Sequence, residues 1–547
     1  MKNMTNISSI KKSLLMGAAS IGVNGLLPAD PILSSWYTEG SGRYARIWET
    51  GAAEAAERGG AAVSSVTTWN FEDYADVNSG AQLLPVYAGV QGVSYSSDYV
   101  YIKSTGLANS TMGPWFRDGS RTTMFTGFPA NGAYLTRFPR SVSYPSTYQK
   151  SSSSANPTGL GVAGLSVDGV PLFDSSDGQS YNRGGVWNQD AYYNEGGTFD
   201  SGFAHQNGGR FHYHSYSPAL RHLLGDSVDY DPSVVFTGPP LGSTGTSQSP
   251  YTENFNGTHS PIIGWMLDGL PLYGPYGYGD PKDSTSAVRR MISGYQQRDG
   301  SNGSVDLATT GRTSLPLWVT YMSNRSQTIS TAGPTLAERN LGRYYEDNAY
   351  KGDLISDATN TPMEQYVNVS TQGAFDETKH FDLNAYNVRW CVTPEFPTGT
   401  WAYFTNIDAD GSPVFPYNLA KNYWGDSSLA SNIEASQVET TGVVVLFEGA
   451  ASIPPTSTSV SVENGDITLT WSIVEGGSYR IDTSSDLANW NETATPETAG
   501  PEPVSITEAI GSRERMFYRL TQAAELADYD TTPFSTETNA RGGGGPR

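Results

Sequence analysis

Short stretches in which apolar and polar residues alternate recur along most of this chain, and they predict β-strands. Tyr95 and the run Tyr99–Ile102 are one such region, bounded by Gly and Ser residues. Helical periodicity is rare. It predicts one helix over 43–58 at most, ended by Gly59-Gly60, and a short helix over 217–224 with Ser217 as N-cap and Pro218 in its first turn. The pattern therefore predicts a mainly β protein with long loops and few helices.

One apolar pattern occurs twice. The stretch Gly164–Phe173 (GLSVDGVPLF) matches Gly264–Tyr273 (GWMLDGLPLY). Asp-Gly between apolar runs favours a tight β-hairpin, and we predict a type I′ turn with positive φ at both central residues. Pro171 and Pro271 cannot donate to a strand ladder, so each second strand is expected at a sheet edge or beginning with a bulge. The two matching hairpins predict a pseudo-symmetric β core.

Changes in composition divide the chain into five expected parts. We predict an export signal at 1–30, a large β domain at 31–450, a Pro/Thr/Ser linker at 451–458, a small β-sandwich module at 459–523 and a disordered Gly-rich tail at 524–547. The export prediction rests on Lys11 and Lys12 before the apolar run 14–27. That run is too short to span a membrane, so the expected location is extracellular or at the cell surface.

Charge and cysteine content exclude several classes of protein. The 547 residues carry 33 Lys and Arg against 55 Asp and Glu, for a net charge of −22. So acidic a chain is a poor partner for nucleic acid or an anionic membrane. The single cysteine, Cys391, rules out an intrachain disulfide and a thiolate cluster, and a buried apolar role is favoured for it.

The strongest chemical signal is the run Gly209–His214 (GRFHYH), in which two histidines lie two residues apart. On a β-strand, His212 and His214 face the same side, while Phe211 and Tyr213 face the other. Such a pair can present two imidazole nitrogens to one metal ion, and neutral imidazole is the commonest ligand of zinc and copper in proteins. The alternative is that these histidines are hydrogen-bonded core residues.

Other residues in the same region extend this candidate site. His205 and His259 lie close enough in sequence to complete a four-histidine metal site with His212 and His214. Asp190, Glu195 and Asp200 are candidates to complete the ligand shell or to orient an imidazole through its second nitrogen. His222 and His380 are expected to be ordinary hydrogen-bonded residues. The chain has no Gly-x-Ser-x-Gly, phosphate-binding loop or His-Glu-x-x-His motif.

The region around the run Gly209–His214 resembles the YHYH-domain family. The family is named for a Tyr-His-Tyr-His run, and its first Tyr is replaced by Phe211 here. The resemblance covers roughly residues 31–450 and not the module at 459–523. It implies an exported bacterial protein but no particular reaction. The matching blocks are 187–191 (WNQDA), 195–200 (EGGTFD), 204–205 (AH), 211–214 (FHYH), 259–265 (HSPIIGW), 267–278 (LDGLPLYGPYGY), 342–347 (GRYYED) and 393–404 (TPEFPTGTWAYF).

Three functions remain open at this point, and hydrolysis through carboxylates alone ranks last among them. The first is a secreted metal-binding protein with His205, His212, His214 and His259 around copper or zinc, acting as a metal-dependent hydrolase or a copper redox protein if it is an enzyme. The second is a non-catalytic surface or matrix protein that binds an extracellular glycan or a cell-surface protein through aromatic loops. Stacking faces would then come from Trp265, Tyr276, Tyr278 and Trp401.

Overall fold

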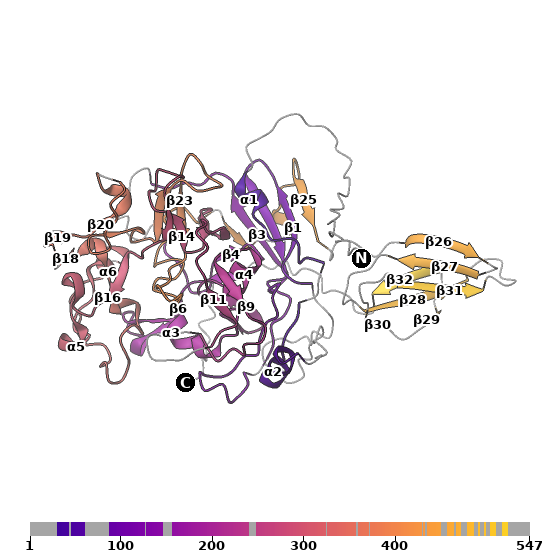
Figure 1. The fold of residues 1–547 in the computed structure, drawn as a ribbon, viewed down its shortest axis with the longest axis horizontal. Helices are drawn as coiled ribbons and strands as arrows, with labels where there is room; N and C mark the ends of the chain where they lie inside the picture. Colours follow the sequence, from indigo (N-terminus) through magenta and orange to yellow (C-terminus); the bar gives the residue numbers. More distant parts are fainter. Residues whose placement is uncertain are drawn as a thin grey trace, which may run out of the picture.

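The protein is mainly β in the computed structural model, with 32% of residues in strands and 14% in helices, which confirms the predicted fold class (Figure 1). The structure describes residues 30–42, 45–60, 87–125, 127–145, 156–239, 248–323, 325–356, 359–370, 372–428, 430–432 and 435–449, together with the C-terminal strands. Within these residues, no helix is long and apolar enough to cross a membrane. The expected export signal before Asp30, most of the linker and the tail lie outside the described residues.

An eight-stranded sheet is the centre of the main domain, and its strands run in the order β22-β23-β13-β12-β4-β5-β9-β8. The two repeated hairpins are β4–β5 and β12–β13, and they lie side by side through antiparallel pairing of β4 with β12. The strands are β4 (Val162–Ser166), β5 (Pro171–Phe173), β8 (Ala204–Asn207), β9 (Arg210–Tyr213), β12 (Ile262–Met266), β13 (Pro271–Tyr273), β22 (Val388–Cys391) and β23 (Thr400–Phe404).

The hairpins form as predicted, but their turns are of another type. Only the glycine of each Asp-Gly pair has positive φ, 82° at Gly169 and 81° at Gly269. In the first hairpin, Ser166 pairs with Val170 around a three-residue loop, the arrangement in which a glycine in the left-handed region forms a bulge. The type I′ prediction was wrong, because neither Asp168 nor Asp268 has positive φ; in this conformation the Asp268 carboxylate accepts from the Leu270 amide at 3.2 Å.

The prolines begin strands that lie inside the sheet. Pro171 is the first residue of β5, and β5 pairs with β4 on one side and with β9 on the other. The register of the β4–β5 pair shifts between Val162 and Gly164, as it does between Ile262 and Gly264 in the second hairpin. These shifts lie in the first strand of each hairpin, opposite the end of the second, so they are not the bulge expected where the second strand begins, and neither second strand is a sheet edge.

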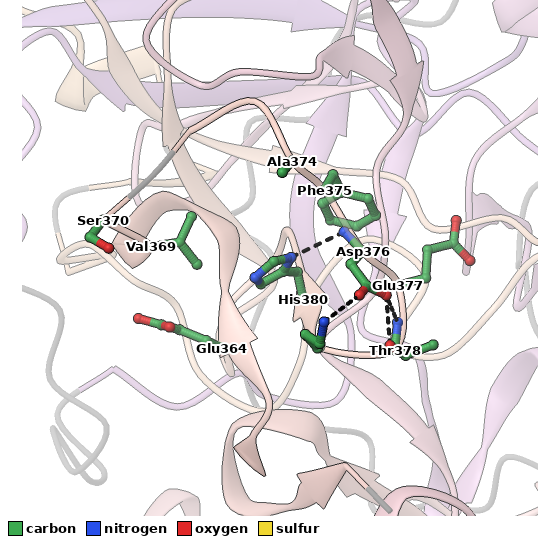
Figure 2. Close-up of a pocket in the computed structure, with 10 residues that line it drawn as sticks. Glu364, Val369, Ser370, Ala374, Phe375, Asp376, Glu377, Thr378 and His380 are labelled. Carbon is green, nitrogen blue, oxygen red and sulfur yellow. Dashed lines mark hydrogen bonds and ion pairs between the residues drawn. The ribbon is translucent and has the colours of Figure 1, made fainter. Parts of the chain in front are cut away.

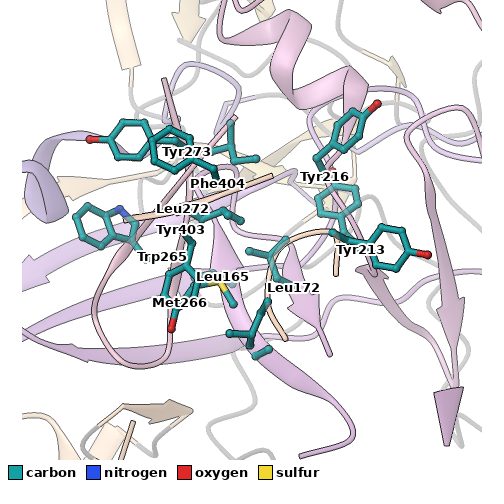
Figure 3. Close-up of a cluster of buried hydrophobic side chains, with 14 of the residues drawn as sticks. Leu165, Leu172, Tyr213, Tyr216, Trp265, Met266, Leu272, Tyr273, Tyr403 and Phe404 are labelled. Atoms are coloured by element: carbon teal, nitrogen blue, oxygen red, sulfur yellow. The ribbon is translucent and has the colours of Figure 1, made fainter. Parts of the chain in front are cut away.

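A five-stranded sheet in the order β24-β3-β2-β1-β25 shares one apolar core with the central sheet. The first hairpin turn contacts it directly, since the Ser104 hydroxyl donates to the Gly169 carbonyl at 2.8 Å. Figure 3 shows part of this core, in which Leu165, Leu172 and Leu272 lie among aromatic rings. The strands are β1 (Val90–Tyr95), β2 (Tyr99–Ser104), β3 (Tyr134–Pro139), β24 (Ser431–Asn432) and β25 (Val444–Glu448).

The remaining strands of this domain form short two-stranded pairs in the connections. These are β6 (Ser176–Ser180) with β7 (Asn188–Asp190), β10 (Val228–Tyr230) with β11 (Tyr251–Glu253), β14 (Tyr276–Tyr278) with β15 (Val288–Arg290), β16 (Tyr295–Gln297) with β17 (Asn348–Tyr350), β18 (Ile355–Ser356) with β19 (Thr361–Pro362), and β20 (Glu364–Gln365) with β21 (His380–Phe381).

Helices in the described residues are short, as predicted. The first expected helix is α2 (Gly51–Arg58), which starts later than the predicted maximum because Thr50 caps it by accepting from the Ala53 amide. The second is α4 (Pro218–Leu223), with Ser217 as its N-cap. The others are α1 (Pro31–Ser34), α3 (Ala191–Glu195), α5 (Leu307–Thr310) and α6 (Leu317–Met322).

Strands β26 to β32 pair only with one another in the described residues, in one sheet of β26, β27 and β31 and another of β28, β29, β30 and β32. Leu469, Trp471 and Ile481 form a small core between them. This arrangement agrees with the expected module, although its domain boundaries stay a prediction. The strands are β26 (Ser457–Glu463), β27 (Asp466–Trp471), β28 (Ser478–Ser484), β29 (Asn491–Glu492), β30 (Glu497–Thr498), β31 (Val504–Ala509) and β32 (Phe517–Gln522).

Candidate metal centre

Three histidines meet on one face of the hairpin β8–β9 at the edge of the central sheet. A tight turn at Gly208 and Gly209, both with positive φ (61° and 80°), joins the strands and places His205 directly opposite His212. His214 lies just beyond β9, on the same face as His212 as its spacing predicts. The three residues are buried, with exposed fractions of 7%, 2% and 5% in chain order.

The hydrogen bonds of the Nδ1 atoms determine the tautomer of each ring. His212 Nδ1 lies 2.8 Å from the Arg210 carbonyl, and His214 Nδ1 lies 2.9 Å from the Asp174 carbonyl. A carbonyl only accepts, so both Nδ1 atoms carry the proton. His205 Nδ1 lies 2.8 Å from the Thr198 hydroxyl, which already donates to the Glu195 carbonyl and must therefore accept from the imidazole.

The Nε2 atoms of these three rings consequently point their lone pairs toward one another. The Nε2–Nε2 distance is 3.1 Å from His205 to His212 and 3.1 Å from His212 to His214. All three atoms lie within 4.8 Å of one another, so the group can hold a metal ion. Zinc–nitrogen bonds measure about 2.0–2.1 Å, which separates neighbouring ligands of one ion by about 3 Å.

Burial and mutual proximity oppose a positive charge on two of these rings. Burial lowers the pKa of His205, and burial together with the other two imidazoles lowers the pKa of His212 well below its usual value. Burial also acts against a charge on His214, but the adjacent Glu195 carboxylate outweighs it and raises the pKa. Neutral imidazole is the form that binds metal, and His205 and His212 favour it.

Glu195 contacts two of the histidines directly, which is the placement needed for the first role considered for it, completion of the ligand shell. Its Oε2 lies 3.3 Å from His205 Nε2 and 3.2 Å from His214 Nε2. Burial alone would raise the pKa of Glu195, but the hydrogen bonds and charges of His205 and His214 hold it well below its usual range. The carboxylate is thus available as a fourth ligand.

The other two predicted carboxylates, Asp190 and Asp200, accept hydrogen bonds from backbone amides near the centre. Asp190 caps α3 by accepting from the Tyr193 amide at 3.0 Å, and it also accepts from the Tyr417 hydroxyl at 2.8 Å. Asp200 accepts from the amides of Gly113 and Gly202 at 2.8 and 2.9 Å. Burial raises the pKa of each carboxyl to about 7. Asp190 begins the helix whose last residue is Glu195.

The structure does not bring His259 to this cluster. Its Nδ1 donates to the Ser260 carbonyl at 2.7 Å, and its ring packs against those of Tyr273, Tyr278 and Phe404. Burial lowers its pKa to about 4. His259 precedes β12, in the other half of the central sheet, so its nearness in sequence to His214 does not become nearness in space.

The remaining histidines also have local partners. His222 Nδ1 lies 2.9 Å from the Val228 carbonyl. His380 accepts from the Asp376 amide at 3.1 Å, in a surface hollow beside β20 and β21 (Figure 2). The residues that line this hollow include none of the three clustered histidines, so it is a separate feature.

Most of the aromatic residues proposed as stacking faces are buried. Trp265, Tyr276 and Trp401 are only 2%, 6% and 8% exposed, and Tyr278 is half-buried against His259. The Trp265 indole nitrogen donates to the Ser35 hydroxyl, which fixes that ring inside the core. Three of the four ring faces therefore contact protein and do not face solvent.

Several residues around the centre were not found from the sequence. The Phe173 ring stacks on His212 with centroids 3.9 Å apart, and Phe199 packs against His205 and His214. The Asp177 carboxyl lies beside Glu195, and burial together with that carboxylate raises its pKa to about 6. Phe173 is the last residue of the first repeated hairpin, and Asp177 follows it closely. The repeated hairpin was therefore the sequence signal that could have pointed to these two residues.

The comparison with known families agrees with this region. A model of the YHYH protein family matches residues 141–413, a range that contains the three histidines and Glu195 but is narrower than the expected 31–450. Comparisons with curated proteins and with solved structures find no match. The expected family is thereby confirmed: over residues 141–413 the chain belongs to the YHYH protein family.

Proposed function

We propose that this protein binds a transition-metal ion through His205, His212 and His214, with Glu195 as the fourth ligand. Copper and zinc are the two candidates, because imidazole with carboxylate suits both. The Lys-Lys and apolar pattern near the N-terminus supports export, so the proposed place of action is outside the cell. A bound ion there would act as a Lewis acid or, if it is copper, as a redox centre.

The observation that carries the proposal is the convergence of three lone pairs in a buried site. Each Nδ1 proton is already donated elsewhere, so the Nε2 atoms of His205 and His212, the two rings that favour the neutral form, cannot hydrogen-bond to each other. Buried polar atoms normally have a partner, and leaving one without a partner costs about 1–3 kcal/mol. A metal ion would satisfy all three nitrogens and the carboxylate together.

The proposal is tested by the metal content of the purified full chain. We expect close to one equivalent of copper or zinc in the wild type and a loss of it in His212→Ala. His222→Ala is the matched control, because it removes a histidine bonded to a carbonyl away from the cluster. Circular dichroism of both variants would exclude misfolding. A wild-type protein that neither contains a transition metal nor takes one up from copper or zinc salts would contradict the proposal.

A further inference from the structure

The contacts among the four donor atoms of Glu195, His205, His212 and His214 follow a particular order. The inference drawn from this order rests on the metal binding proposed above. Glu195 Oε2 contacts His205, His205 contacts His212, His212 contacts His214, and His214 contacts Glu195 again. The four distances are 3.3, 3.1, 3.1 and 3.2 Å in that order. The contacts therefore close a ring with one donor at each corner.

The two pairs that face each other across this ring are farther apart. Among the described residues, Glu195 forms ion pairs with His205 and His214 but not with His212. The ring centroids of His205 and His214 are 5.5 Å apart, against 4.7 Å for each of the two neighbouring imidazole pairs. Four near edges and two longer diagonals fit a square arrangement better than a tetrahedral one. In a tetrahedron, every donor is equally close to the other three.

The fold explains why the donors lie in this way. His205 and His212 are opposite each other across an antiparallel pair, and His214 is two residues along, so the three imidazoles occupy one face of a single ribbon. Glu195 is the last residue of α3, and its carboxylate contacts His205 and His214. The Nδ1 hydrogen bonds hold the ring orientations, and the stacked Phe173 ring restricts His212 further.

We propose that the centre is a tetragonal copper(II) site with three imidazole nitrogens and the Glu195 oxygen in one plane. Copper(II) prefers square-planar or tetragonal nitrogen and oxygen ligands, and nickel(II) shares this preference. Zinc sites built from four protein ligands are almost always tetrahedral. The ring of contacts fits the first preference and not the second.

The experiment loads the metal-free full chain separately with copper(II), nickel(II), cobalt(II) and zinc(II). We expect an axial electron paramagnetic resonance spectrum for the copper form, with coupling to three nitrogens, and a diamagnetic square-planar nickel form. Cobalt should show only weak visible absorption, because tetrahedral cobalt is the form that absorbs strongly. Intense tetrahedral cobalt bands, or a zinc form preferred over copper in competition, would overturn the inference while leaving metal binding intact.

Substitution of Glu195 tests the fourth corner. Glu195→Ala should weaken copper(II) binding by at least about 10-fold, because removing even a group that only supports the metal ligands costs about 10- to 100-fold. Its copper spectrum should change while the coupling to three nitrogens remains. Glu195→Gln keeps the shape of the side chain and serves as the folding control. An unchanged copper spectrum in Glu195→Ala would place the carboxylate outside the copper plane, and failure of every metal to bind would contradict both proposals.

Discussion

The two halves of the central sheet share one framework and differ in the side chains on it. In each half a repeated hairpin is followed outward by a parallel strand and then by an antiparallel one: β5, β9 and β8 on one side, and β13, β23 and β22 on the other. The central pairing is symmetrical too, since Gly264 pairs with Ser166 and Gly164 with Met266. The hydroxyls of Tyr213 and Tyr403 donate to Asp168 and Asp268, respectively.

The strand registers identify which residues correspond. Leu172 pairs with Tyr213 and Leu272 with Tyr403, so His212 and His214 correspond to Ala402 and Phe404. His205 pairs with His212 as Arg389 pairs with Ala402. One half thus presents three imidazoles, where the other presents a buried guanidinium, a methyl group and a phenyl ring. The frame alone therefore does not make a metal site, and three side chains on one face distinguish the halves.

The largest expected loss of stability comes from a substitution in the half of the central sheet that lacks the histidine cluster. Arg389 donates to the carbonyls of Tyr278 and Gly279 at 2.7 and 2.9 Å, and its guanidinium lies 3.5 Å from the Asp382 carboxylate. Arg389→Met should lower the free energy of unfolding by about 3–5 kcal/mol, because it leaves buried acceptors without their donor. Urea denaturation measures this, with metal content as the control. A loss below about 1 kcal/mol would contradict this structural role for Arg389.

Removal of the proposed metal ion should weaken the half with the histidines. A ligand that binds only the folded state at about 100 to 1,000 times its dissociation constant stabilises it by about 2.7–4.1 kcal/mol. We therefore expect a chelator to lower the melting temperature and to raise amide exchange in β8 and β9 more than in β22 and β23. His212→Ala should not respond to the chelator. Equal changes in both halves would argue against a centre located at the hairpin.

A smaller effect is expected from pH, through the aspartates of the two hairpin turns. Burial raises the pKa of Asp168 and of Asp268 to about 6, above the usual value near 3.8. Each folded carboxyl thus keeps its proton to higher pH than the unfolded one, so its contribution is complete below about pH 4 and is lost as pH rises through 6. The loss is up to about 3 kcal/mol for each group.

The pH effect can be assigned with Asp268→Asn, which keeps the shape of the side chain without its charge. We expect the fall in stability between pH 4 and pH 6.5 to be smaller in this variant than in the wild type. Asp168→Asn should behave in the same way, because the two turns are equivalent. Parallel stability curves for variant and wild type would show that Asp268 does not titrate in this range.

The smallest expected effect is a difference in stability loss between two tyrosine variants, one from each half of the sheet. The Tyr403 hydroxyl donates to Asp268 at 2.7 Å and accepts from the Trp424 amide at 2.8 Å, while the Tyr213 hydroxyl donates to Asp168 at 3.3 Å. Tyr403→Phe should cost about 2 kcal/mol and Tyr213→Phe about 1 kcal/mol, since the second bond is longer. Thermal denaturation of the pair checks the order, and a larger loss in Tyr213→Phe would reverse it.

Local sequence signals predicted the parts of this structure that depend on neighbouring residues. The hairpins follow from Asp-Gly between apolar runs, α4 follows from its Ser-Pro start, and the shared face of His212 and His214 follows from strand periodicity. The Gly208-Gly209 turn, which places His205 opposite His212, was a further local signal that the prediction did not use.

The rest depends on contacts that no local pattern carries. His259 was grouped with the cluster by its sequence distance, but the topology assigns it to the other half. The correspondence of the halves was visible only in the hairpins, which lie 100 residues apart, while Tyr213 and Tyr403 lie 190 apart. The longer connection after β13 hides the remaining equivalence. Asp190 and Asp200 could not be distinguished from Glu195, because their roles depend on which backbone amides reach them.

The tight turn at Gly208 and Gly209 has a further consequence for how this centre forms. It keeps all four donor groups within residues 195–214, so gathering them closes only short loops of chain. Loop closure becomes more costly as the loop lengthens, and here that contribution is small. Affinity for the proposed ion would then be governed by the match between the donors and the metal, and little of the binding energy would go into ordering distant parts of the polypeptide.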